Sequence, residues 1–135
     1  MLPLRYLFRW RVAGVALLIF VLLCTLLPAI WFRTHFRFDT VGIDKVAHML
    51  AFLTLALWFS GQYARESWWR IILGLSIFGV IIEVCQMLTV SRSAEWLDLL
   101  ADLVGIAVGL LIARAGIGGW SLRLENWLLE RGRAR

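Results

Sequence analysis

Charged residues are scarce in this sequence. Asp, Glu, Lys and Arg together make up 17% of the 135 residues, whereas soluble domains carry about 25%. Hydrophobic residues reach 61%, and the mean hydropathy is +0.82. A chain with so little charge cannot cover a soluble surface, so we predict a membrane protein of one compact domain.

Cysteine is also rare, and several catalytic motifs are missing. The two cysteines, Cys24 and Cys85, lie inside apolar runs at a spacing that fits neither a zinc site nor a redox pair. We interpret both as small buried hydrophobic residues. The sequence has no nucleophile elbow, glycine-rich phosphate loop or paired-histidine metal motif, which argues against the enzyme classes that use them.

Long apolar runs are what the sequence has instead. A hydrocarbon core of about 30 Å requires about 20 helical residues. Four runs approach this length, at about residues 12–32, 46–63, 71–90 and 96–113. We predict an all-α fold in which these runs form an integral membrane bundle of four transmembrane helices, a single domain over residues 12–113.

Basic residues mark the two flanking segments and predict the topology. Residues 1–11 form a basic N-terminus, and residues 117–135 are expected to form an interfacial amphipathic helix. Trp120 and Trp127 lie on its apolar side, and Glu125 lies on the other. Ten of the 14 Lys and Arg residues fall on the side that holds both termini, which predicts cytoplasmic termini. The net charge of +5 therefore reflects topology and lipid headgroups, and we expect no nucleic-acid partner.

Ionisable residues in and beside the predicted spans indicate a site. An ionisable group at the bilayer centre costs about 2.5–3.5 kcal/mol, so it has a partner or a function by default. The predicted topology brings polar residues of three helices to one level beneath the extracytoplasmic face. They are Asp44, Lys45 and His48 of the second run, Glu83 and Gln86 of the third, and Arg92, Asp98 and Asp102 at the start of the fourth.

Acid–base roles fit four of these residues. Asp44 and His48 have i, i+4 spacing, which suits a carboxylate that orients a general base, or else a cap acid beside an interfacial histidine. Glu83 suits a general acid or proton carrier, or a structural partner for a cation. Asp98 completes the candidate catalytic set.

Binding roles fit the other polar residues. Arg92 and Lys45 are candidates for holding anionic oxygens of a substrate, and Gln86 is a candidate for orienting it or for bridging two helices. Without a bound metal, the two cations would instead neutralise the acids of the site.

Asp98 and Asp102 also begin a ridge along the fourth run. Gly105 and Gly109 continue this ridge at helical spacing. Small residues let a neighbouring helix approach closely, so we predict that both glycines pack against another helix of the same chain. Together with Glu83, the two aspartates offer three carboxylates, a set of ligands that suits Mg²⁺ or Ca²⁺.

These residues also match a family pattern. The pattern D-K-x-x-H, then E-x-x-Q, then R-S-x-x-x-x-D-x-x-A-[ND]-x-x-G-x-x-x-G resembles the VanZ-like family of small bacterial membrane proteins. In this chain the pattern is carried by Asp44, Lys45, His48, Glu83, Gln86, Arg92, Ser93, Asp98, Ala101, Asp102, Gly105 and Gly109. Asp102 departs from the family, which commonly has Asn there. The resemblance implies a multi-pass protein of the bacterial inner membrane. The family's name-giving member is associated with teicoplanin resistance.

Two main functional hypotheses follow. In the first, the site handles the polar head of a membrane lipid or a lipid-linked cell-envelope precursor, with or without enzymatic turnover. In the second, the protein is a non-enzymatic envelope or glycopeptide-resistance factor in which the polar cluster is structural. A small proton- or ion-coupled transporter is a third alternative, for which four short spans leave little room unless the protein oligomerises.

Overall fold

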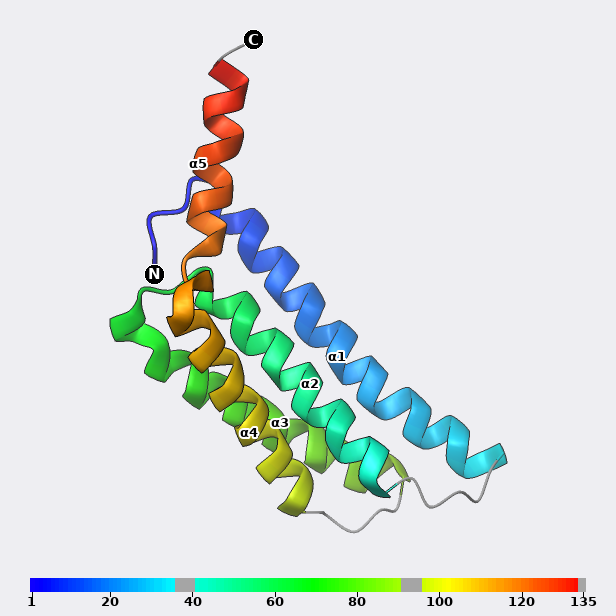
Figure 1. Ribbon diagram of the computed structural model, residues 1–135. Coiled ribbons are helices and arrows are strands. Elements are labelled where there is room, and N and C mark those ends of the chain that lie inside the picture. Colours follow the sequence, from blue (N-terminus) through cyan, green and yellow to red (C-terminus); the bar gives the residue numbers. More distant parts are fainter. Residues whose placement is uncertain (36–40, 91–95, 134–135) are drawn as a thin grey trace.

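The protein is a bundle of helices in the part of the chain that the structure describes. This computed structural model describes residues 1–35, 41–90 and 96–133, with the side chains of 27–35, 41, 43, 89, 90 and 133 left out. The helices are α1 (Leu7–His35), α2 (Val41–Ser60), α3 (Trp68–Val90), α4 (Trp96–Ile112) and α5 (Trp120–Arg133). Helices α1 to α4 run alongside one another, and both chain termini lie at the same end (Figure 1). The described residues contain no strand, which confirms the all-α prediction.

The end of α3 at Val90 and the start of α4 at Trp96 agree with the predicted runs, whereas α1, α2 and α3 each begin three to five residues earlier than predicted. Helix α2 starts at Val41 and includes Asp44 in its first turn, because a negative charge near a helix N-terminus is favourable. It ends at Ser60, and Gly61 follows. A side chain at Gly61 would collide with Trp120 of α5. An apolar run in the sequence ends at the first charged residue, whereas a helix can continue through that residue. The helix can therefore be longer than the apolar run.

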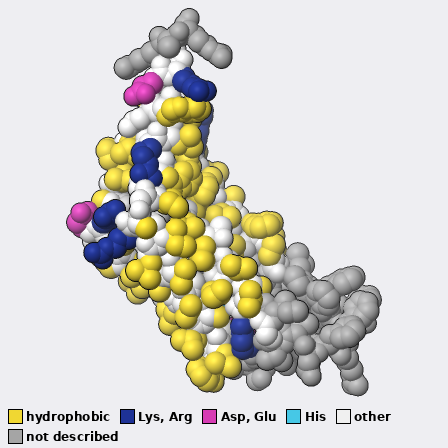
Figure 2. All heavy atoms as spheres, viewed as in Figure 1, with side chains coloured by type: hydrophobic (Ala, Val, Ile, Leu, Met, Phe, Trp, Pro, Cys, Tyr) yellow, Lys and Arg dark blue, Asp and Glu magenta, His cyan; other side chains and the backbone are white. Residues whose placement is uncertain are grey.

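Three described stretches are long and apolar enough to cross a membrane: Leu7–Leu26, Arg65–Leu88 and Trp96–Gly132. Large apolar side chains on these stretches are exposed, such as Ile72, at 45% exposure. In the view of Figure 2, hydrophobic side chains cover most of the bundle, and Lys and Arg lie mainly toward the end that carries both termini. The outer surface of the bundle is therefore suited to hydrocarbon, as expected of a membrane protein.

Helices α2 and α4 make the closest packing in the bundle. A Cβ atom at Gly109 would lie 2.7 Å from the carbonyl oxygen of Leu53 and 2.8 Å from the Cβ atom of Ala56. A Cβ atom at Gly105 would collide with the carbonyl group of Met49. Glycine therefore lets the two backbones touch, and this contact holds the first turns of α2 and α4 side by side.

The apolar core fills the space between the four bundle helices. Its buried members are Val21 of α1, Phe52, Leu55 and Ala56 of α2, Ile71, Leu75 and Ile82 of α3, and Ile106 and Leu110 of α4. Because this core contains residues of all four helices, it fixes the position of α3 relative to the α2–α4 pair.

Helix α5 turns away from the line of the bundle (Figure 1). The turn of π-helix at Ala113–Ile117 contains Gly116 with φ of 145°, a backbone conformation that side-chain-bearing residues rarely adopt. The face of α5 that carries Ser121 and Glu125 is buried, whereas Trp127 and Leu128 are exposed. Helix α5 thus has one face against the protein and an apolar face outside it.

Candidate functional site

A histidine–aspartate pair joins α2 to α4 inside the bundle. His48 and Asp102 are 1% and 2% exposed, and Nδ1 of His48 lies 3.0 Å from Oδ1 of Asp102. With Asp102 ionised, Nδ1–H donates to the carboxylate, and the other nitrogen of a neutral imidazole is then an acceptor. Asp102 holds one ring nitrogen of His48 because the glycine contact brings α4 directly against α2.

The second ring nitrogen of His48 is buried and has no hydrogen-bond partner among the described residues. Buried polar atoms are nearly always hydrogen-bonded, so an unpaired one needs an explanation. An imidazole with one nitrogen held by a carboxylate and the other unoccupied has the geometry of a general base or acid.

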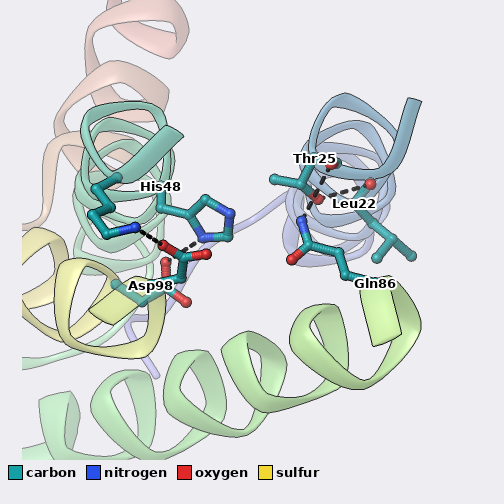
Figure 3. A network of polar contacts seen from close by, with 7 residues as sticks. Leu22, Thr25, His48, Gln86 and Asp98 are labelled. Atoms are coloured by element: carbon teal, nitrogen blue, oxygen red, sulfur yellow. Dashed lines mark hydrogen bonds and ion pairs between the residues drawn. The ribbon is translucent and has the colours of Figure 1, made fainter. Parts of the chain in front are cut away.

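An ion pair lies one helical turn away from this pair. Nζ of Lys45 lies 3.2 Å from Oδ1 of Asp98, and the two side chains are 21% and 1% exposed. Lys45 and His48 come from one face of α2, and Asp98 and Asp102 come from the facing ridge of α4. Figure 3 shows His48 beside Asp98. Asp44 lies within electrostatic range of His48.

Helix α3 contributes Glu83 to the same region. Glu83 is buried and lies within electrostatic range of Asp102. One turn before it, a Cβ atom at Gly79 would come within 2.7 Å of Oδ2 of Asp102. Glycine at position 79 therefore leaves room for the aspartate, and the Gly79–Glu83 face of α3 closes the site from the third side.

Gln86 bonds to another helix rather than to this cluster. Its Nε2 donates to the carbonyl oxygen of Thr25 on α1 at 3.3 Å, and Figure 3 shows it turned toward Thr25. Its Oε1 is buried and has no hydrogen-bond partner in the described part of the chain. Gln86 therefore bridges α3 and α1, the second of the two roles predicted for it.

The predicted metal ligands do not form a metal-binding group. Within residues 1–35, 41–90 and 96–133, no cluster of three His, Cys, Asp or Glu side chains is arranged to hold a metal ion. Asp98 and Asp102 pair instead with Lys45 and His48. Arg92, the other predicted anion-binding residue, lies outside the described residues.

An apolar cavity lies on the side of α2 that faces α1. It has a volume of about 290 Å³ and opens between α1 and α2. Ala47 and Ala51, on either side of His48 in the sequence, line it together with Thr25, whose carbonyl oxygen accepts the bond from Gln86. A cavity with this lining is suited to an acyl or isoprenoid chain.

The pairing of Asp102 with His48 and the cavity are the parts of the site that the sequence did not predict. The role of Asp102 could have been found from the ridge it shares with Gly105, because a glycine ridge brings neighbouring side chains against the facing helix. The family model VanZ/LLP1 matches residues 3–118 of this chain. Searches of curated proteins and of solved structures gave no match.

Proposed function

The chain belongs to the VanZ/LLP1 family, and from this membership we propose that its buried polar site handles the head group of a lipid or lipid-linked envelope precursor. The observation that carries the proposal is His48, which is held by Asp102 at one ring nitrogen and has no described partner at the other. In this role His48 accepts or donates a proton at the head group, and Asp102 positions its ring.

The other residues of the cluster take supporting roles in the proposal. Lys45 exchanges its contact with Asp98 for an anionic oxygen of the head group, because an ammonium group on a flexible stem can change partners. Glu83 serves as a second acid. The cavity between α1 and α2, which Ala47 and Ala51 line near His48, holds the first part of the hydrocarbon chain.

We propose a multi-pass topology in the bacterial inner membrane. In addition to the three stretches named above, helix α2 also crosses the membrane, because it packs along α4. Both termini are cytoplasmic because most Lys and Arg residues lie on their side. Helix α5 lies in the interface with its exposed Trp127 and Leu128 toward lipid. This topology puts His48 near the extracytoplasmic headgroups.

A second candidate is a non-enzymatic glycopeptide-resistance factor. The side-chain contacts Lys45–Asp98 and His48–Asp102 favour this candidate. Paired polar groups can order a helix bundle without binding a ligand. In this candidate, resistance to teicoplanin follows the amount of folded protein and not the chemistry of His48.

The experiment that separates the two candidates is the substitution His48→Gln. Gln keeps an N–H donor for Asp102 but cannot transfer a proton, so the fold is preserved. We expect loss of the cellular phenotype, read as teicoplanin susceptibility, with an unchanged amount of protein in the membrane. Thr54→Ala is the matched control on α2, since the Thr54 hydroxyl donates only to Leu50 of its own helix. A His48→Gln variant with full phenotype would rule out the proposal.

A further inference from the structure

A second cavity lies at the other end of the bundle, toward the chain termini. It has a volume of about 180 Å³ and is lined by residues of α1, α2 and α3 and of the segment between α2 and α3. The lining residues are Leu18, Phe59, Tyr63, Arg70, Ile71, Gly74, Leu75 and Phe78. Phe59 is eleven residues after His48, roughly 16 Å along the helix, so this cavity is separate from the site described above.

The lining of this cavity has one cation among apolar and aromatic groups. Arg70 is exposed, and its guanidinium carbon lies 5.3 Å from the ring centroid of Trp69. The following turn of α3 exposes Ile72 and Leu73, which are suited to contact with lipid tails. Trp and Arg at the first turn of an apolar helix are typical of the headgroup level. The cavity therefore starts at a headgroup-level cation and continues among apolar side chains.

We propose that this cavity binds an anionic phospholipid of the leaflet on the side of the termini. One acyl chain fills the space between Leu18, Leu75 and Phe78, and the phosphate group contacts Arg70. Charge complementarity selects this occupant, because the guanidinium group is the one charged group among the described lining residues and an anionic headgroup pairs with it. The site does not depend on the function proposed for His48.

Gly74 offers a direct test of the acyl position. A Cβ atom at Gly74 would meet no atom within 4 Å, although the residue lines the cavity. Gly74→Leu therefore fills the cavity without a backbone clash, and it replaces a helix-interior glycine by a better helix former. Gly132→Leu is the matched control, since a Cβ atom there also meets nothing within 4 Å and Gly132 lies outside the cavity.

The experiment is native mass spectrometry of the full chain after purification in equimolar phosphatidylglycerol and phosphatidylcholine. For the wild type we expect about a five-fold preference for phosphatidylglycerol, from about 1 kcal/mol for one basic residue near an anionic headgroup. Arg70→Gln should abolish the preference while lipid is still retained, and Gly74→Leu should reduce retention of both lipids. Arg114→Gln, which removes a charge at the same end of the bundle, should change nothing.

Two results would overturn the proposal. One is an unchanged preference for phosphatidylglycerol in Arg70→Gln, which would place the anionic headgroup elsewhere. The other is full retention of both lipids in Gly74→Leu, which would leave the cavity without an acyl chain. Circular dichroism of each variant keeps loss of fold distinguishable from loss of binding.

Discussion

Two buried polar clusters in this protein use their groups in opposite ways. At the end that carries the termini, the Glu125 carboxylate accepts hydrogen bonds from the backbone N–H groups of Arg5 and Tyr6 and from the indole of Trp10, at 2.7, 3.0 and 2.7 Å. At the α2–α4 contact, His48 uses one ring nitrogen and leaves the other without a described partner.

The difference lies in the titratable groups, since Nε1 of Trp58 beside Glu125 also has no hydrogen-bond partner among the described residues. Glu125 accepts from the N–H groups of Arg5 and Tyr6, the two residues just before α1, so it joins α5 to the start of α1. The rings of Trp10, Trp58 and Trp120 pack beside it with centroids 5.3–5.7 Å apart. In this cluster the carboxylate has donors for both oxygens, whereas one nitrogen of His48 has no hydrogen-bond partner among the described residues.

The largest loss of stability is expected from a substitution that disrupts the α2–α4 packing around His48. Gly105→Leu forces a side chain against the carbonyl group of Met49 and should destabilise the protein by more than about 3 kcal/mol. Thermal unfolding in detergent measures this, with Gly132→Leu as the control in open space. An unchanged melting temperature for Gly105→Leu would show that α2 and α4 do not pack as described.

Removing the Glu125 carboxylate should destabilise the protein less than Gly105→Leu does, and it should affect stability alone. Glu125→Ala leaves three N–H donors without their acceptor and should destabilise the protein by about 2–3 kcal/mol. Any phenotype should then fall in proportion to the amount of folded protein. A Glu125→Ala variant that folds normally yet is inactive would show that the two clusters were assigned the wrong way round.

Acid should weaken the Glu125 cluster selectively. Burial alone would raise the pKa of Glu125, but the N–H donors of Arg5, Trp10 and Tyr6 outweigh it and hold the pKa below its usual value of 4.5. The unfolded chain therefore binds this proton more readily, and the stabilising contribution is complete above about pH 4.5 and disappears as the pH falls through the folded-state pKa. The melting temperatures of wild type and Glu125→Gln should converge at low pH. A constant difference would contradict this.

The smallest effect is expected for the partly exposed ion pair. A double-mutant cycle with Lys45→Gln and Asp98→Asn should give a coupling energy of about 1 kcal/mol, since the Lys45 side chain is 21% exposed. Unfolding of the four proteins in detergent provides the numbers. A coupling near zero would mean that the contact with Asp98 does not hold Lys45 in place and would weaken its proposed role at the head group.

Local patterns in the sequence predicted the bundle and part of the site. Hydropathy predicted the apolar helices. The spacing of Asp98, Asp102, Gly105 and Gly109 predicted that they share one ridge of the helix, and all four residues are buried. These are properties of a single helix, whose period is fixed by backbone geometry.

Contacts between distant segments could not be predicted in the same way. His48 and Asp102 are 54 residues apart, and Glu125 and Arg5 are 120 residues apart. Asp44 was the only acid at helical spacing from His48, so the local pattern favoured it over Asp102. Glu125 lay on the polar side of an amphipathic pattern, which predicts exposure, and only the packing of α5 against the start of α1 buries it.

The most direct test of the central claim observes the two nitrogens of His48. The chain has two histidines, so the variant His35→Gln with ¹⁵N-labelled histidine in nanodiscs reports His48 alone by NMR. On addition of farnesyl phosphate, a short isoprenoid phosphate, the Nε2 resonance should move while Nδ1 remains hydrogen-bonded to Asp102. An Nε2 resonance that stays unchanged at saturating farnesyl phosphate would contradict a head-group site at His48.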